Sequence, residues 1–165
     1  MSLSTTSPSA LKAILWAGFV AGTLDALAAV VVLGKMKAIP VFKYIASGFF
    51  GREAFTGGID MVGYGVLFHY LIALAFTLVY FFIFPYLPFL RKEKIASGLL
   101  YGICVWVIMN FVVLPLSNVP PTPFTWQNVL VGILLLMFLV GLPISWIIHR
   151  YYRLNRGSFV RPFRF

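Results

Sequence analysis

Three polar side chains, Asp25, His69 and Asn110, lie inside long apolar segments and are the residues of this sequence best suited to chemistry. An imidazole beside a carboxylate can be held as an ion pair, or can exchange a proton with it near neutral pH. An amide can orient either group through hydrogen bonds. The three residue types therefore predict an intramembrane polar cluster, which a proton-coupled carrier or a small polar solute site would use.

These side chains are costly to place inside a bilayer. An Asp at the middle of a spanning helix costs about 2.5–3.5 kcal/mol on insertion scales, so Asp25 should face other helices and be partnered, protonated or both. At about 1.5 Å per residue, Asp25, His69 and Asn110 lie roughly 18, 22 and 21 Å from the predicted cytoplasmic ends of their helices, so they can meet slightly outside the midplane. A second interpretation stays open, in which they are interhelical hydrogen bonds that fix packing, each contributing about 0.6 kcal/mol.

The sequence contains no motif typical of another kind of catalytic, metal or cofactor site. Cys104 is the single cysteine, and no Cys/His spacing resembles a zinc site. No Gly-x-Ser-x-Gly elbow, phosphate loop or dinucleotide fingerprint occurs, and His149 lies too far in depth from His69 for both to ligate one haem iron. No catalytic residue, metal or cofactor is therefore assigned, and Cys104 is interpreted as a small packing residue.

Composition indicates a membrane protein. Of 165 residues, 61% are hydrophobic and 10% are charged, with a mean hydropathy of +0.97, whereas soluble domains are roughly 45–50% apolar and about 25% charged. The net charge of +9 comes from 13 Lys and Arg that all lie outside the long apolar runs. Basic residues at the ends of spans follow from membrane topology, whereas a nucleic-acid binder carries them on one face of a soluble fold, so no nucleic-acid partner is expected.

Four apolar runs have the length of about 20 residues that a helix needs to cross a bilayer. They predict an all-α, integral membrane four-helix bundle. In the first outer loop, Pro40 to Phe50 predicts a short helix, lying either in the membrane interface or as a lid over a polar cavity. The predicted spans are 13–34, 61–84, 95–116 and 129–148, in a domain of residues 12–149 between a flexible N-terminal tail, 1–11, and a basic aromatic tail, 150–165.

The distribution of Lys and Arg predicts the orientation of the bundle. Nine lie in the two tails and the second loop, against four in the first loop and none in the third. The positive-inside rule therefore places both termini in the cytoplasm. The nine are Lys12, Arg91, Lys92, Lys94, Arg150, Arg153, Arg156, Arg161 and Arg164.

The last five of these cations alternate with aromatic and aliphatic residues in the C-terminal tail. Such a segment should lie on anionic lipid head groups, with each cation contributing about 1 kcal/mol. The alternative interpretation of the tail is a docking site for a cytoplasmic partner. For the chain as a whole, the expected protein partner is another membrane protein or a second copy of the chain. The predicted contact residues are Arg150, Arg153, Arg156, Arg161 and Arg164.

Small residues predict where the helices pack. Lipid gives helices no hydrophobic reason to associate, so close approach over glycine and alanine must hold them together. Stripes at spacings of three or four occur in each of the first three spans, and a Gly-x-x-x-Gly pair recurs 80 residues apart in the first and third. The predicted packing positions are Gly18, Gly22, Gly65, Gly98 and Gly102.

The chain resembles small four-span inner-membrane proteins of bacteria, some of them grouped as YagU-like. The resemblance rests on Ala17-Gly18-Phe19-Val20-Ala21-Gly22-Thr23-Leu24-Asp25, on Ser97-Gly98-Leu99-Leu100-Tyr101-Gly102, and on Met109-Asn110-Phe111-Val112-Val113-Leu114-Pro115, with Ile45-Ala46-Ser47-Gly48 from the outer loop. It would cover most of residues 12–150. It implies a location in the bacterial inner membrane, and it brings neither an activity nor a catalytic residue, because the family has no established activity.

These observations lead to one function with two alternatives. The first is a transport-type or accessory inner-membrane protein that uses the polar cluster. The second is a structural or assembly subunit of a larger membrane complex, in which the cluster only fixes packing and the basic tail docks the partner. The third is a membrane enzyme that acts on a lipid or quinone.

Overall fold

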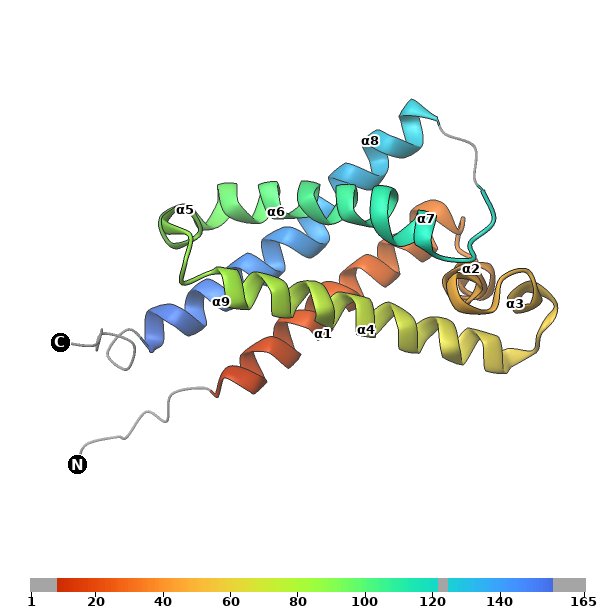
Figure 1. Cartoon of the computed structure of the whole chain (residues 1–165), viewed down its shortest axis with the longest axis horizontal. Coiled ribbons are helices and arrows are strands. Elements are labelled where there is room, and N and C mark those ends of the chain that lie inside the picture. The colour runs from red at the N-terminus through yellow and green to blue at the C-terminus, as the bar shows by residue number, and fades with distance from the viewer. Residues whose placement is uncertain (1–8, 122–124, 156–165) are drawn as a thin grey trace.

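The computed structural model describes residues 9–121 and 125–155, and in these ranges the chain is helical and contains no strand (Figure 1). Four helices are long and apolar enough to cross a membrane. The chain is therefore a multi-pass membrane protein, and the predicted all-α four-helix bundle is confirmed. The four spans are α1 (Ala10–Ala28) with the π-helical segment η1 (Ala29–Leu33), α4 (Ile59–Ile83), α6 (Lys94–Ile108) with η2 (Met109–Val113) and α7 (Leu114–Leu116), and α8 (Trp126–Leu135) with η3 (Leu136–Gly141) and α9 (Leu142–Leu154).

Local sequence signals set several helix ends. The Ser9 side chain accepts a hydrogen bond from the Lys12 main-chain N–H at 3.3 Å and so caps α1. The Thr125 hydroxyl caps α8 in the same way, and Pro88 occupies the first turn of the short helix α5 (Pro88–Lys92). Gly51, with a φ of 62°, ends the outer-loop helix α2 (Ala38–Phe50), because few residues other than glycine adopt this backbone conformation without strain.

Two predicted boundaries need correction. The first span begins at Ala10, so the N-terminal tail ends before residue 11. The last helix continues to Leu154, where the tail was predicted to begin at residue 150, because Tyr151 is buried and the Tyr152 ring stacks on Phe84. Arg150 and Arg153 therefore belong to α9, while Arg156, Arg161 and Arg164 lie outside the described residues.

The spans form two hairpins, in which α1 packs on α4 and α6 packs on η3 and α9. The α1 helix also packs against α9 and joins the hairpins. Glycines permit the close contact within each hairpin. A methyl group on Gly18 would lie 2.6 Å from Leu74 Cδ2, and one on Gly102 or Gly141 would overlap the facing backbone. All five predicted packing glycines lie against a neighbouring helix.

The first and third spans have the same features at the same spacing along the chain. Their Gly-x-x-x-Gly pairs are followed at the same distance by a π-helical segment, η1 at Ala29–Leu33 and η2 at Met109–Val113, and the two segments are 80 residues apart. A π-helical segment accommodates one extra residue and often marks a functional position. In η2 this segment contains Asn110.

The outer-loop segment consists of α2 and α3 (Glu53–Thr56) and packs across α4. Gly65 of α4 permits this contact, since a Cβ there would overlap the Phe42 backbone. The Lys43 ammonium donates hydrogen bonds to the carbonyl oxygens of Phe55, at 3.2 Å, and Gly57, at 2.6 Å, and so ties α2 to the end of α3. Asn118 of the third loop donates its side-chain N–H to the Phe49 carbonyl at 3.0 Å. A helix in this loop was predicted, and in the structure it packs on α4 and is hydrogen-bonded to the third loop.

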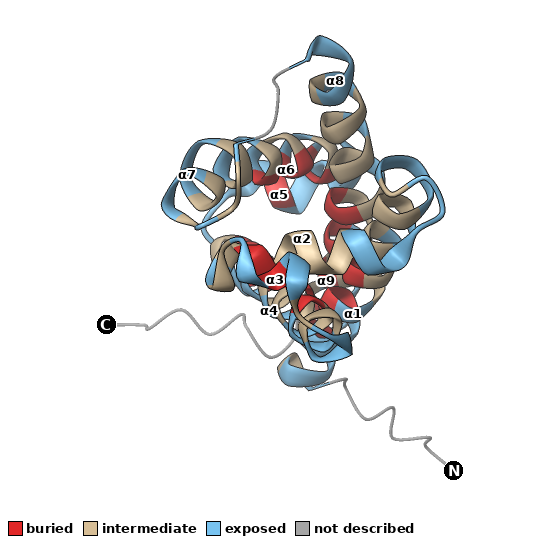
Figure 2. Cartoon of the chain, turned by 90° about the vertical axis from the view of Figure 1, so that its right-hand side faces the viewer, coloured by how far each residue is buried: buried red, intermediate tan, exposed pale blue. Residues whose placement is uncertain are grey.

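Opposite ends of the bundle carry different elements (Figure 1). The start of α1, α5 and the end of α9 lie at one end, whereas α2, α3, α7 and the start of α8 lie at the other. Seen from the second end, buried residues face one another inside the bundle and exposed residues face outward (Figure 2). Many exposed side chains are large and apolar, for example Phe111, which is 68% exposed, as expected of helices surrounded by lipid.

Three buried hydroxyl groups hold α4, α6 and α9 together near the α5 end. Tyr80 donates to Ser145 at 2.9 Å, and its oxygen lies 3.0 Å from the Ser97 hydroxyl. Ser145 in turn donates to the Lys94 carbonyl at 2.6 Å. Each of these polar groups thus has a partner inside the bundle, as an apolar surrounding demands.

Candidate intramembrane site

The centre of the candidate site is His69, which is 9% exposed at the interface of α4 with α1. Its Nε2 lies 2.7 Å from the main-chain carbonyl oxygen of Gly22. A carbonyl oxygen only accepts, so Nε2 carries the proton and donates it in this bond. Nδ1 makes no hydrogen bond within the described ranges.

Asp25 lies one helical turn beyond Gly22 on α1 and is half-buried. Its main electrostatic neighbour is the imidazole of His69. Within the described ranges, the Asp25 side chain forms no hydrogen bond, and no ion pair within 4.0 Å joins it to His69. The carboxylate therefore lies near the imidazole without a direct hydrogen bond or ion pair to it.

Aromatic and hydroxyl side chains surround this pair. The Thr23 and Tyr70 hydroxyl oxygens lie 2.9 Å apart and join α1 to α4 beside His69. The Tyr70 ring meets the imidazole edge-on with 5.6 Å between ring centroids. The Phe42 ring, from α2, also meets the imidazole edge-on, with 6.4 Å between the ring centroids. The α2 helix thus places an aromatic ring against the candidate site.

Asn110, the third predicted member, has other partners. Its side-chain N–H donates to the Trp106 carbonyl one turn earlier, at 2.9 Å. No hydrogen bond of the described residues connects it to Asp25 or His69. Its span packs chiefly on η3 and α9, whereas the acid and the imidazole lie on α1 and α4. Similar depth along the helices therefore did not by itself bring Asn110 to the pair.

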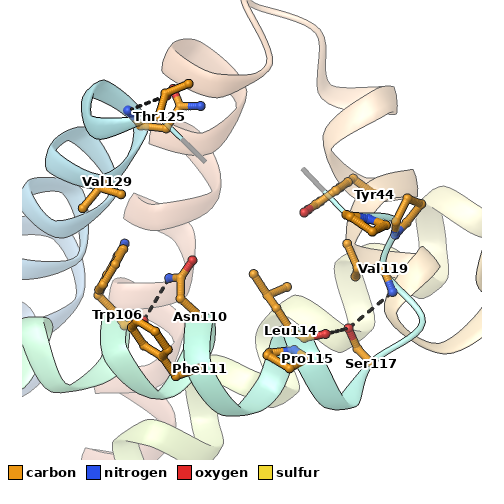
Figure 3. Close-up of a pocket in the computed structure, with 13 residues that line it drawn as sticks. Tyr44, Trp106, Asn110, Phe111, Leu114, Pro115, Ser117, Val119, Thr125 and Val129 are labelled. Atoms are coloured by element: carbon orange, nitrogen blue, oxygen red, sulfur yellow. Dashed lines mark hydrogen bonds between the residues drawn. The ribbon is translucent and has the colours of Figure 1, made fainter. Parts of the chain in front are cut away.

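Asn110 instead lines a pocket of about 480 Å³ between α2, the η2–α7 segment and the start of α8 (Figure 3). Tyr44 forms part of the opposite wall, from α2. Trp106 and Pro115 add apolar surface from the third span, and Thr125 adds a hydroxyl group from the N-terminus of α8. The pocket thus has polar groups on more than one wall.

Two of the five predicted lipid-contact residues lie in the described part of the chain. Arg150 and Arg153 are exposed on α9 at the end that also carries α5, whose Arg91 and Lys92 are exposed as well. At the same end, the Lys94 ammonium lies 4.1 Å from the centroid of the Trp146 ring, a cation–π contact.

Sequence reasoning missed two features. The hydroxyl cluster of Tyr80, Ser97 and Ser145 escaped because single hydroxyl residues in apolar runs carry no spacing signal. Cys104, interpreted as a packing residue, is exposed on α6. The described residues hold no group of three His, Cys, Asp or Glu that could bind a metal ion.

Fold and site together define a four-span helical membrane protein with an acid–imidazole pair between its first two spans. Comparison of the chain with protein-family models, curated proteins and solved structures found no match.

Proposed function

We propose that this chain is a small transport-type protein of the bacterial inner membrane in which Asp25 and His69 exchange a proton. The observation that carries the proposal is the placement of an acid and an imidazole on facing helices inside the bundle. Ionisable groups at such depth are rare and commonly mark ion or proton pathways. Membership of the YagU-like group, implied by the glycine-rich motifs, is part of the proposal.

The geometry supports a definite division of roles. The bond from His69 Nε2 to Gly22 holds the ring in place, and the proposal assigns the exchanged proton to Nδ1. The Asp25 carboxylate stabilises the imidazolium while the pair as a whole stays neutral. A second proton gives the pair a net positive charge, and release of that proton restores neutrality. A solute whose binding favours one of these two states would move together with the proton.

The orientation with cytoplasmic termini also belongs to the proposal. It is supported by the gathering of exposed cations at the end of the bundle that holds α5 and the end of α9. With this orientation the pair lies in the outer half of the bilayer, and α2 and α3 lie on the periplasmic side.

The test is proton flux in liposomes that contain the purified protein and a pH-sensitive dye, with flux started by an imposed membrane potential. Asp25→Asn and His69→Gln should each abolish the flux. Asp60→Asn, which removes the exposed acid in the first turn of α4, is the matched control and should leave the flux unchanged. Flux that persists in Asp25→Asn would contradict the proposal.

The alternative function, an assembly subunit, is favoured by the same exposed basic end. Its cations would contact anionic head groups, a membrane-protein partner or a second copy of the chain. Because Tyr151 and Asn155 are buried, a truncation that tests docking should remove residues 156–165 only and leave α9 intact. Loss of a co-purifying partner on truncation would support this function, and native mass spectra without any partner would count against it.

A further inference from the structure

The pocket at Asn110 is a second polar site in the bundle, and its lining differs chemically from the acid–imidazole pair. Thirteen residues line it, and none of the thirteen is charged (Figure 3). A pocket without a charged group gives no compensation for the lost hydration of an ion. The occupant that fits it is therefore an uncharged molecule.

Two hydrogen-bonding side chains face this pocket from opposite walls. Asn110 uses one N–H for Trp106, so its carbonyl oxygen and second N–H stay available. The Tyr44 hydroxyl forms no hydrogen bond within the described ranges. Figure 3 shows Asn110 on η2 and Tyr44 on α2 pointing toward the space between the two elements. An occupant with oxygen atoms on two opposite edges could accept from both side chains.

Apart from the polar side chains of Ser117, Thr125 and Asn128, the remaining lining is apolar. Trp106, Phe111 and Leu114 line the pocket from the third span, and Pro120 and Pro121 line it from the third loop. Such surfaces favour a planar ring over a flexible chain, because aromatic and proline rings present rigid faces. Phe111 is also 68% exposed on the outside of the bundle, so the pocket reaches the lipid-facing surface there.

We infer that this pocket binds an uncharged, planar ring compound with hydrogen-bond acceptors on opposite edges, the chemistry of a quinone head group taken from the membrane. The two carbonyl oxygens of a quinone accept from Tyr44 and Asn110, and the ring lies among Trp106, Phe111 and Pro115. The pocket volume of about 480 Å³ falls in the range of ligand sites, roughly 300–1,000 Å³. The inference concerns binding and stands apart from proton exchange at Asp25.

The test uses menadione, a naphthoquinone without a tail, titrated into the protein in lipid nanodiscs while tryptophan fluorescence is recorded. Saturable quenching is expected and should be largely lost in Trp106→Phe. Tyr44→Phe and Asn110→Leu should each raise the Kd roughly 2- to 10-fold, the effect of one lost hydrogen bond. Tyr64→Phe is the matched control, because Tyr64 is exposed and does not line the pocket.

The possible results of the titration distinguish quinone binding from its alternatives. Quenching that rises without saturation, or a Kd unchanged in the Tyr44→Phe/Asn110→Leu double variant, would overturn the inference. Binding of a neutral disaccharide in place of menadione would also overturn it. Circular dichroism on each variant distinguishes lost affinity from lost fold. Asp25→Asn should leave the menadione Kd unchanged, so failure of the proposed proton exchange would not affect this result.

Discussion

His69 on α4 donates its Nε2–H to the main-chain carbonyl of Gly22 on α1 across a distance of 2.7 Å. The bond joins an ionisable ring to a backbone group that only a close helix crossing can present. Gly22 makes this crossing close, since a Cβ there would lie 3.1 Å from the Tyr70 ring and 3.2 Å from Ala73. Packing of the first hairpin and placement of the imidazole are thus one structural feature.

Gly22→Val should separate α1 from α4 and lengthen the His69 bond. Overpacking of a close contact typically costs about 1–3 kcal/mol, so the free energy of unfolding in mild detergent should fall by that amount. Gly63→Ala is the control, because a Cβ at Gly63 has no neighbour within 4 Å. Equal stability of the two variants would show that the crossing is looser than described.

Tyr80→Phe should weaken the packing of α4, α6 and α9 around the hydroxyl cluster of Tyr80, Ser97 and Ser145 without unfolding the protein. The variant removes two hydrogen bonds at about 3 Å but leaves Ser97 and Ser145 in contact at 3.2 Å, with Lys94 as an acceptor. We expect a loss of about 0.5–1.5 kcal/mol in the free energy of unfolding, measured by reversible denaturation in mixed micelles. Tyr86→Phe, at a residue that is 82% exposed, should cost nothing, and an equal loss there would contradict the assignment.

Hydropathy and length sufficed to predict the four spans, because a helix must satisfy its own backbone in lipid and needs about 20 apolar residues to cross it. The ends were less predictable. Arg150 and Arg153 suggested a tail, yet α9 continues because Tyr151 and Tyr152 pack on Phe81. Their aromatic contacts bridge residues about 70 positions apart in the chain, which local composition does not reveal.

The candidate site was predictable in part. Depth along the helices grouped Asp25, His69 and Asn110, and two of the three are electrostatic neighbours in the structure. Depth contains no information about which helices are adjacent, so the separate environment of Asn110 could not be foreseen. The pocket at Asn110 also depends on Tyr44, whose position follows from the packing of α2 over Gly65.

Gly65→Leu should displace α2 from α4, because even a Cβ at this position overlaps the Phe42 backbone. Phe42 lies against the His69 ring, so its displacement should expose the imidazole. Modification of His69 by diethyl pyrocarbonate, followed by mass spectrometry, should become several-fold faster. His149 at the opposite end of the bundle is the internal reference, and an unchanged ratio of the two rates would show that α2 does not cover His69.

Lys43→Met should loosen the outer loop alone. The ammonium group donates to two carbonyl oxygens at the end of α3, which lose this partner in the variant. Hydrogen exchange of residues 53–57 should accelerate, while exchange in α4 stays slow. Lys35→Met, in the same loop but outside this contact, is the control. Equal acceleration in both variants would argue against a specific role of Lys43.

The most direct test of the central claim is a double-variant comparison of proton flux in liposomes, with Asp25→Asn, His69→Gln and the two combined. Groups that act as one unit are strongly non-additive, so the double variant should be no slower than either single variant. This result would show that flux requires Asp25 and His69 as one unit. Residual flux in each single variant, with losses that multiply in the double variant, would show two independent residues and contradict the account.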